Sequence, residues 1–244
     1  METQTISRTA LITGAAGGIG QAIAESFAAQ GIRLALVDMR DTSDLAARLG
    51  PDNRSFVLDL EDPAAIETVV GAIGAEMGID IVVNNAGAGI LFPAEEASIA
   101  GWDTTMSVNL RAPWLLSAAA LPYLKASKAG RIINISSQAG IVAIEDHVAY
   151  GASKAGLIMV TKVLALEWAK FGITVNCIAP TVVETPMALV GWSGKKGVKA
   201  RQDIPVGRFA KPEEVAAAVT YLSSALASII TGETLVVDGG YTIK

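Results

Sequence analysis

The chain has 244 residues, a formal net charge of −5 and 51% hydrophobic residues. This length suffices for a full hydrophobic core, and so high a hydrophobic share excludes a disordered chain. The acidic balance argues against a nucleic-acid partner, because such binding depends on neutralising phosphates. The single cysteine, Cys177, excludes an internal disulfide and a cysteine-based metal cage.

The mean hydropathy of +0.44 raises the question of a membrane. The longest uncharged run, residues 215–232, contains hydroxyl residues, and the run 81–94 contains amide, glycine and proline residues, so neither is a convincing span. The polar start, residues 1–8, predicts no signal peptide. Parallel strands that are buried on both faces explain the hydropathy better. We therefore expect a cytoplasmic protein without a membrane partner.

Short β-type runs alternate with Ala-rich helical patterns along the whole chain. The expected strands are residues 9–13, 33–38, 54–58, 80–84, 131–136, 174–178 and 234–237. The main expected helices are residues 19–30, 63–77, 102–124, 150–170 and 212–226. Such alternation with short connections predicts right-handed parallel βαβ units in one sheet. Residues 1–244 then form one doubly wound α/β domain with a seven-stranded parallel sheet and helices on both faces. The segment 190–201 is rich in Gly and Lys and indicates an exposed loop, part of a flexible flap over about residues 186–205.

A glycine-rich turn, residues 13–20 (TGAAGGIG), directly follows the first strand and opens the first helix. Gly14 permits the tight turn, Gly18 lets the backbone approach a pyrophosphate, and Gly20 lets the helix pack closely on the strand. The N–H groups at the start of the helix and its dipole favour phosphates. This pattern predicts a Rossmann-type dinucleotide site that includes Ala16 and Ile19. A purely structural turn is the alternative.

Asp38 ends the second strand, 18 residues after Gly20, where an acid accepts both ribose hydroxyls of NAD. The same carboxylate would repel the 2′-phosphate of NADP, and residues 15–17 include no basic partner for that phosphate. Arg40 is the opposing feature, since its guanidinium can pair with a 2′-phosphate. We expect NAD, with Met39 next to its ribose. The alternative is that Asp38 only caps a turn.

Tyr150 and Lys154 stand at positions i and i+4, on one face of an expected helix. A phenol with a pKa near 10 is a weak base at neutral pH. A neighbouring ammonium and a positive nicotinamide would stabilise the phenolate and lower that pKa. Ser137 ends an apolar strand 13 residues before Tyr150, where its hydroxyl can polarise a substrate oxygen. Alone, such a Tyr–Lys pair more often marks a solvated helix face.

With the glycine turn, Asn84-Asn85-Ala86-Gly87, Asn109 and the C-terminal Val237-Asp238-Gly239-Gly240, the sequence resembles the short-chain dehydrogenase/reductase family over essentially the whole chain. The resemblance implies that Tyr150 is the general acid/base and that Lys154 lowers its pKa and binds the nicotinamide ribose. It implies that Ser137 hydrogen-bonds the reacting oxygen. Asn109 would hold a water in a proton relay to Lys154, and a structural kink is the alternative for it.

The resemblance also assigns further cofactor contacts. It places adenine against Asp59 and Leu60, and the rest of the cofactor along Asn85, Ala86 and Gly87. After the sixth strand the family usually has Pro-Gly and then a Thr that binds the carboxamide. Here Pro180 is followed by Thr181, a departure that concerns the shape of the pocket. Thr185 keeps its place, and Val183 would contact the ring amide through its backbone.

The segments 137–150 and 179–183 resemble the polyol and 1,2-diol dehydrogenases of this family, which include D-threitol dehydrogenases. These oxidise a secondary hydroxyl to a ketose with NAD. Gln138 and His147 would bind a second hydroxyl, unless His147 only caps or packs the helix start. Trp192 would shield the pocket, or it is an isolated exposed side chain. Basic residues that would attract an anionic substrate, or form a solvated face, are Lys195, Lys196, Lys199 and Arg201.

Two other functions remain open. One is a 3-oxoacyl-carrier-protein reductase with NADPH, whose motifs are very similar and against which Asp38 argues. The other is a catalytically silent NAD-binding sensor or scaffold, against which the complete Asn-Ser-Tyr-Lys set argues. The family resemblance implies a homotetramer, and no cluster with metal-ligand spacing is present in the sequence.

Overall fold

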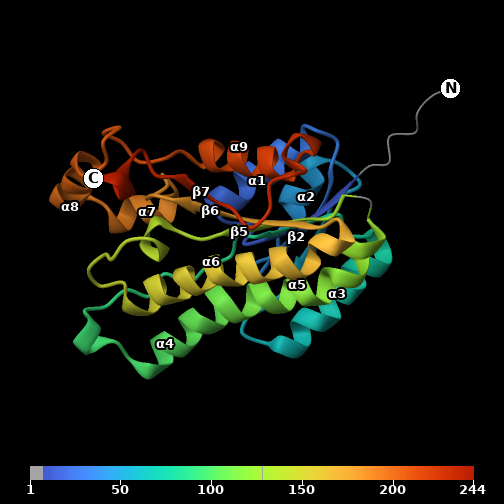
Figure 1. The fold of residues 1–244 in the computed structure, drawn as a ribbon, viewed down its shortest axis with the longest axis horizontal. Helices are drawn as coiled ribbons and strands as arrows, with labels where there is room; N and C mark the ends of the chain where they lie inside the picture. Colours follow the sequence, from blue (N-terminus) through green and yellow to red (C-terminus); the bar gives the residue numbers. More distant parts are fainter. Residues whose placement is uncertain (1–7, 128) are drawn as a thin grey trace.

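The computed structural model describes residues 8–127 and 129–244. Residues 1–7, for which no signal peptide is predicted, lie outside the described part. Seven parallel strands form one sheet in the order β3-β2-β1-β4-β5-β6-β7 (Figure 1). The strands are β1 (Thr9–Thr13), β2 (Arg33–Asp38), β3 (Arg54–Val57), β4 (Ile81–Asn84), β5 (Arg131–Ile135), β6 (Thr174–Pro180) and β7 (Thr234–Val237). The predicted doubly wound fold is confirmed.

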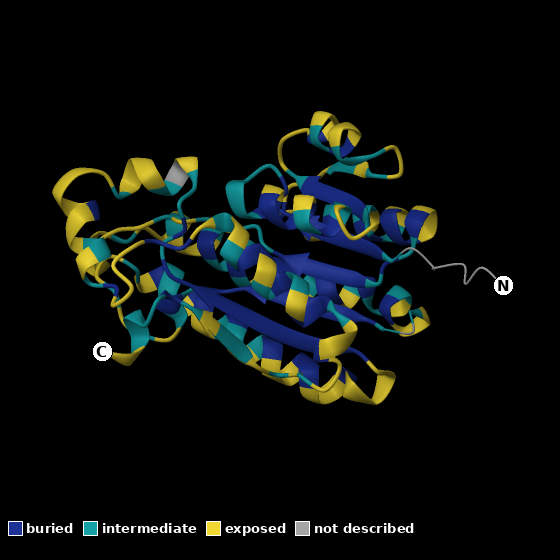
Figure 2. Cartoon of the chain, turned by 90° about the horizontal axis from the view of Figure 1, so that it is seen from above, coloured by how far each residue is buried: buried dark blue, intermediate teal, exposed yellow. Residues whose placement is uncertain are grey.

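Helices cover both faces of this sheet (Figure 1). One face carries α1 (Gly18–Ala28), α2 (Ser43–Leu49) and α9 (Pro212–Ser223). The other carries α3 (Pro63–Met77), α4 (Ile99–Met106), α5 (Ala112–Ala126) and α6 (Val148–Trp168). Successive strand residues point to opposite faces, so that Ile12 joins the first core and Leu11 the second. Figure 2 shows the buried strands between helices whose outer faces are exposed.

Local sequence signals set several helix boundaries. The Asp62 carboxylate accepts the N–H groups of Ala64 and Ala65 at 2.9 and 3.1 Å, and Pro63 suits the first helical position. α3 ends at Gly78, whose φ of 71° L side chains rarely adopt. Asp62 and Gly78 therefore fix the helix that the sequence predicts over 63–77.

The predicted helix over 102–124 is interrupted. The chain leaves α4 at Met106, passes through a π-helical turn at Ser107–Arg111, and continues as α5. Pro113 has no N–H to donate to the carbonyl four residues back, so a regular α-helix cannot run through this point.

The Gly- and Lys-rich segment is helical rather than a loop, so that prediction is wrong. It forms α7 (Pro186–Gly191) and α8 (Gly194–Gln202). Thr185 caps α7 by accepting the Ala188 N–H at 3.2 Å, and Pro186 occupies its first turn. Composition alone did not reveal these start signals. The flexibility of the segment stays a prediction.

The strand order changes direction between β1 and β4, which are neighbours in the middle of the sheet. β1 pairs with β2 on one side and with β4 on the other. The connections from these strands leave toward opposite faces, so a crevice opens at their carboxyl ends. That edge carries α7, α8 and the C-terminus (Figure 1).

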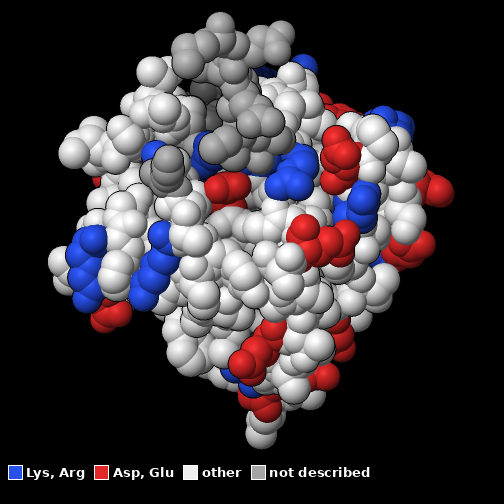
Figure 3. Space-filling model, turned by 90° about the vertical axis from the view of Figure 1, so that its right-hand side faces the viewer, with Lys and Arg blue, Asp and Glu red and all other residues white. Residues whose placement is uncertain are grey.

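The helix Val148–Phe171, which is α6 with the turn after it, is long and apolar enough to cross a membrane by length and composition. In the fold one side of this helix packs on the sheet: Leu157 and Leu164 are buried, and its Thr161 hydroxyl accepts a hydrogen bond from Asn134 of β5 at 2.8 Å. Its other side is exposed. Figure 3 shows the face at the opposite end from α8, where basic and acidic side chains are interspersed rather than gathered into a basic patch.

Candidate active site

A cavity of about 700 Å³ opens at the carboxyl edge of the sheet, and its size suits a small ligand. Segments far apart in the sequence line it. The predicted site residues on its wall are Ile19, Asn85, Gly87, Ser137, Gln138, His147, Tyr150, Lys154, Pro180, Val183, Thr185 and Trp192. The fold thus brings most of the predicted catalytic and substrate residues to one place.

The glycine turn leaves no room for side chains at two positions. Gly14 has a φ of 66°, and a Cβ there would lie 2.8 Å from the Ala86 Cα. A Cβ on Gly20 would lie 2.1 Å from the Gly14 carbonyl oxygen. Gly17 precedes α1 and offers no side-chain cap, so the first N–H groups of the helix stay available to an anion. This turn fits a dinucleotide phosphate.

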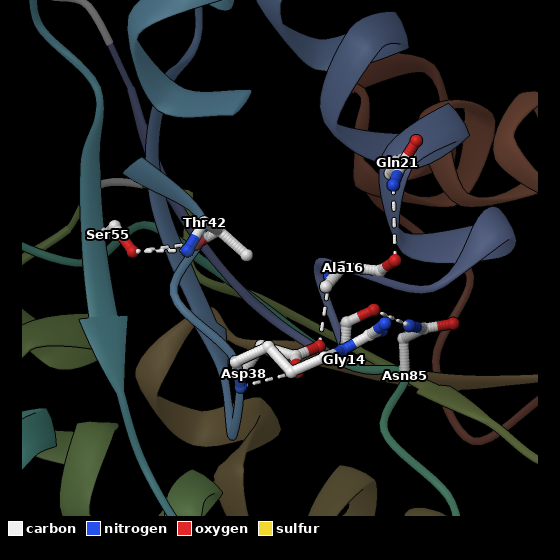
Figure 4. A network of polar contacts seen from close by, with 8 residues as sticks. Gly14, Ala16, Gln21, Asp38, Thr42, Ser55 and Asn85 are labelled. Atoms are coloured by element: carbon white, nitrogen blue, oxygen red, sulfur yellow. Dashed lines mark hydrogen bonds and ion pairs between the residues drawn. The ribbon is translucent and has the colours of Figure 1, made fainter. Parts of the chain in front are cut away.

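The Asp38 carboxylate is held against this turn (Figure 4). Its Oδ2 accepts the Ala16 N–H at 2.9 Å, and its Oδ1 accepts the Arg40 N–H at 3.0 Å. The Arg40 guanidinium also forms an ion pair with Oδ1 at 3.5 Å. A fixed carboxylate at the end of β2 fits a ribose diol, and Arg40 is turned toward Asp38 itself.

The loop after β4 is tied to the glycine turn (Figure 4). Asn85 Nδ2 donates to the carbonyl oxygens of Thr13 and Gly14 at 2.9 and 3.2 Å. The Ala86 N–H donates to Thr13 Oγ1 at 3.1 Å. This loop is thereby placed along the path predicted for the cofactor.

Other predicted cofactor residues are not all at the cavity. Leu60 is buried, Asp59 accepts the Glu61 N–H at 2.9 Å, and Met39 is 69% exposed. These three do not line the cavity, so their contact with adenosine stays a prediction. A Cβ on Gly18 would lie 2.9 Å from Thr185 Cγ2, which places the phosphate turn next to the start of α7.

Three members of the predicted catalytic set meet at α6. Tyr150 and Lys154 lie one turn apart, with Lys154 Nζ 5.6 Å from the Tyr150 ring centroid. Lys154 is buried, and Nζ donates to the Ile135 carbonyl oxygen at 2.8 Å. The Ser137 hydroxyl hydrogen-bonds the Tyr150 phenol. A substrate oxygen between Ser137 and Tyr150 would contact both hydroxyls.

Burial dominates the pKa values of this pair. It lowers the pKa of Lys154 to about 8, opposed by the neighbouring Cys177 sulfur. It raises the pKa of the Tyr150 phenol, and the Ser137 hydrogen bond opposes that rise. The lowered phenol pKa that the motif predicts is therefore not found in the protein alone, and it stays a prediction for the complex with an oxidised nicotinamide.

Asn109 lies in the π-helical turn and is fully buried. Its Oδ1 accepts the Ala88 N–H at 2.7 Å, and its Nδ2 donates to the Ala88 carbonyl oxygen at 2.9 Å. Nδ2 also donates to the Ser153 hydroxyl, which in turn donates to the Tyr150 carbonyl oxygen. Asn109 therefore lies where the chain departs from a regular α-helix, as the structural alternative for it expects, and the choice between that role and the relay stays open. Gly87 lies between Asn109 and Lys154, and the water relay stays a prediction.

His147 and Trp192 face the cavity. The His147 ring makes no capping hydrogen bond to α6. It packs edge-on against the Tyr150 ring, with 5.8 Å between the two ring centroids. Its Nδ1 lies against the Glu145 carbonyl oxygen, so a neutral ring is protonated at Nδ1 and leaves Nε2 as an acceptor. Trp192 packs edge-on against Phe209, with 6.3 Å between the ring centroids. The alternative that Trp192 is an isolated exposed side chain is therefore wrong.

The basic residues of α8 share the cavity wall with carboxylates. Lys196 and Lys199 line the cavity, but so do the carboxylates of Glu145, Asp146 and Asp203. Lys196 Nζ lies 4.9 Å from the Trp192 ring centroid. Lys195, Lys196 and Lys199 are exposed, and the Arg201 guanidinium stacks 4.1 Å from the Phe209 ring centroid. This arrangement favours the solvated-face interpretation.

Sequence reasoning did not find Ser153 or Tyr241. Ser153 links Asn109 to the backbone of Tyr150, and Tyr241 lines the cavity from the C-terminal turn. A helical serine and a tyrosine near the chain end carry no signal of their own. Across residues 8–127 and 129–244, no group of three His, Cys, Asp or Glu side chains is placed to hold a metal ion.

Comparisons with known proteins agree with this geometry. A family model described as enoyl-(acyl carrier protein) reductase matches residues 14–242. The chain is 46% identical to a D-threitol dehydrogenase of Mycolicibacterium smegmatis, over 97% of this chain and 94% of that protein. It is 43% identical to an NAD-dependent glycerol dehydrogenase of Listeria innocua, over 97% of this chain and 94% of that protein.

More distant relatives are similar along their whole length too. A 3-oxoacyl-[acyl-carrier-protein] reductase of Salmonella typhimurium is 38% identical over 96% of each chain. A solved structure from Beutenbergia cavernae, named an NAD(P) dependent gluconate 5-dehydrogenase with bound NADP, superposes with a TM-score of 0.93. It is 34% identical and covers 98% of both chains.

Proposed function

The chain belongs to the short-chain dehydrogenase/reductase family of oxidoreductases, and from that premise we propose that it is an NAD-dependent polyol or 1,2-diol dehydrogenase. The reaction is the oxidation of a secondary hydroxyl to a ketone or ketose, and it is reversible. The observation that carries the proposal is the cavity, which sets the Ser137–Tyr150 pair beside the polar side chains of Gln138 and His147.

The residues present fit a nicotinamide dinucleotide. The uncapped start of α1 would hold the pyrophosphate, Asp38 the adenosine ribose, and Lys154 the nicotinamide ribose. Val183 and Thr185 would bind the carboxamide. When bound, the cofactor supplies the hydride acceptor. NAD is favoured because the Asp38 carboxylate repels a 2′-phosphate, and a relative named as NAD-dependent supports this choice.

The protein's own groups handle the proton. Tyr150 takes the proton of the substrate hydroxyl, and the Ser137 hydroxyl holds the same oxygen. The Lys154 ammonium stabilises the phenolate, and Asn109 would hold the relay water. Because burial raises the pKa of the Tyr150 phenol, oxidation should speed up as the pH rises, whereas carbonyl reduction should be favoured at lower pH. Burial lowers the pKa of Lys154 to about 8, so its ammonium can stabilise the phenolate only where it keeps its proton, and the positive charge of the oxidised nicotinamide is needed as well.

A second candidate is a 3-oxoacyl-carrier-protein reductase. The 38% identical relative favours it. The description of the matching family model also names a reductase of acyl-carrier-protein substrates, although one that acts on enoyl groups. Asp38 opposes it if the reduction uses NADPH. A silent NAD-binding sensor would need no Ser137, Tyr150 and Lys154 arrangement.

We also propose a cytoplasmic homotetramer. Apolar side chains are exposed on α6 and near the C-terminal end, where an assembly would cover them. They include Met159, Val163, Leu166, Leu226, Ile229 and Ile243. Sedimentation equilibrium tests the assembly, because a tetramer has about four times the 25.2 kDa of one chain.

The test of function is nicotinamide absorbance with NAD or NADP against tetritols, pentitols, hexitols and short vicinal diols, and with a 3-oxoacyl thioester in reverse. We expect turnover of a polyol or diol with NAD. Reduction of the thioester with NADPH, without diol oxidation, would establish the second candidate instead. Cofactor binding without any turnover would establish the sensor.

A further inference from the structure

Two residues of the cavity wall hold polar atoms without partners. Gln138 Oε1 and Thr181 Oγ1 are buried and make no hydrogen bond within the described residues. Each residue is only 6% exposed. Burying a polar group without a hydrogen bond is unfavourable, so each such group needs an explanation.

Unpartnered hydroxyls elsewhere show that this feature alone does not mark a binding site. The hydroxyls of Thr174, Ser223 and Thr234 are also buried without partners, and these residues do not line the cavity. Gln138 and Thr181 differ because both belong to its wall, together with Ser137 and Tyr150.

The sheet register brings Gln138 and Thr181 to the same end of two neighbouring strands. β5 and β6 are neighbours, with Ile135 opposite Ile178. Gln138 and Thr181 each come three residues later in the chain, just past the carboxyl ends of these strands. Ser137, which would hold the reacting oxygen, directly precedes Gln138. The two unpartnered groups therefore lie next to the point of reaction.

The free group at Thr181 is its side chain. Its backbone N–H already donates to the Val237 carbonyl oxygen of β7 at 3.1 Å. That bond fixes the backbone, so a ligand at this position would meet the hydroxyl. A glycine, which the family resemblance leads one to expect here, would offer no such group.

The chemistry of the pair selects the ligand. An amide and a hydroxyl are uncharged, and both can donate and accept, as a substrate hydroxyl does. An apolar acyl chain or a monohydric alcohol would leave both groups unpaired, and sites with buried polar groups discriminate strongly against such analogues. We propose that Thr181 and Gln138 form a subsite for the second hydroxyl of a vicinal diol, the one on the carbon next to the reacting carbon. Thr181 is then a specificity-determining residue. This inference rests on the proposed oxidation of diols.

The test compares butane-2,3-diol with butan-2-ol, both with NAD. The quantity is the selectivity ratio, kcat/KM for the diol divided by kcat/KM for the monohydric alcohol. Thr181→Val keeps the shape of the side chain and removes the hydroxyl, so we expect the ratio to fall about tenfold or more, chiefly through KM for the diol. Thr181→Ser, which keeps the hydroxyl, should restore most of the ratio. Gln138→Leu should lower it in the same direction, and the double variant should lose less than the product of the single losses.

Thr174→Val is the matched control. Thr174 lies at the other end of the same strand, is also 6% exposed and also has an unpartnered hydroxyl. The selectivity ratio of the Thr174→Val variant should equal that of the wild type. The affinity for NADH, measured by fluorescence without substrate, should be the same in Thr181→Val and wild type, because the subsite binds substrate.

Three results would overturn the subsite. Thr181→Val could keep the full ratio, it could slow both alcohols equally, or it could weaken NADH binding as strongly as diol turnover. Failure of the proposed function is visible earlier, in the wild type. If the wild type oxidises no polyol or diol of the panel described above, the function and the subsite fall together before any variant is compared. If it oxidises diols but does not favour butane-2,3-diol over butan-2-ol, the subsite alone falls.

Discussion

At the glycine turn, backbone atoms of the β1–α1 and β4 connections meet so closely that Gly14 and Gly20 have no room for a Cβ. Around Gln138, Thr181 and Trp192, by contrast, side chains from turns and short helices line an open cavity of about 700 Å³. The Asp38 carboxylate of the first region is bound by the protein itself, through its hydrogen bond with the Ala16 N–H, and the N–H groups at the start of α1 stay available to a ligand. In the second region some are not.

The difference teaches where each kind of recognition resides. At the glycine turn, the close approach of the backbone to the ligand can be tested at single glycines. It serves the cofactor phosphates, which are the same whatever the substrate. Side chains on a cavity wall can be exchanged without changing the fold, and they serve the part that varies, the substrate. The predictions below disturb one region and ask whether the other responds.

The largest effect is expected for Tyr150→Phe. Removing the phenol hydroxyl removes the proton acceptor, so kcat should fall about 1,000-fold or more. NADH affinity, measured by fluorescence, should stay within about twofold of the wild type, since the glycine turn is untouched. Tyr221→Phe, on the exposed side of α9, is the control and should keep full activity. Substantial turnover by Tyr150→Phe would remove the acid/base role.

Gly20→Ala disturbs the other region. The new Cβ would lie 2.1 Å from the Gly14 carbonyl oxygen, so the turn must open. We expect NADH affinity to weaken about tenfold or more and the midpoint of thermal unfolding to fall. Gly71→Ala in α3 is the matched control: nothing lies within 4 Å of its Cβ, and alanine favours a helix. A Gly20→Ala protein that binds NADH normally would contradict the role of close backbone contact.

Lys154→Met tests the cost of the buried ammonium. Burial lowers the pKa of Lys154 to about 8 from its ordinary value of 10.5, so the unfolded chain binds more protons between these pH values. The charged side chain therefore destabilises the fold below pH 8, and this penalty disappears as the pH rises to about 10.5. We expect an inactive variant that is more stable at pH 7, by at most about 3 kcal/mol, with the gain lost toward pH 10. A gain that is constant with pH would contradict the shifted pKa.

The smallest effect is expected for His147→Ala. Loss of the Nε2 acceptor should raise KM for a polyol about threefold to tenfold and leave KM for NAD almost unchanged. His147→Gln, which keeps an acceptor, is the partner variant and should recover part of the loss. If KM for the polyol is unchanged, His147 does not contact the substrate.

The sequence predicted the regular parts of the molecule well because their signals are local or repeated. Buried strands such as β2 read as continuous apolar runs, and α3 carries its own cap, Asp62. The catalytic set was recognisable because Tyr150 and Lys154 share a helix face. The break at Asn109 depends on Pro113 and on contacts with Ala88, which lies 21 residues away. The sequence did not predict the helices α7 and α8, because the Gly- and Lys-rich composition of the segment suggested a loop and the capping residue Thr185 was not given enough weight.

The substrate side could not be predicted to the same depth. Thr181 and Gln138 are 43 residues apart and become neighbours only through the register of β5 and β6. The pKa of Tyr150 depends on burial, which no motif encodes, and its shift is opposite to the one expected from Lys154 alone.

The most direct test of the account is hydride transfer from butane-2,3-diol deuterated at carbons 2 and 3. After incubation with NAD and the wild-type protein, mass spectrometry of the reduced cofactor reports whether deuterium has moved. We predict reduced cofactor that carries one deuterium per diol oxidised, and none formed by Tyr150→Phe. Unlabelled reduced cofactor, or labelled cofactor formed equally well by Tyr150→Phe, would contradict the account.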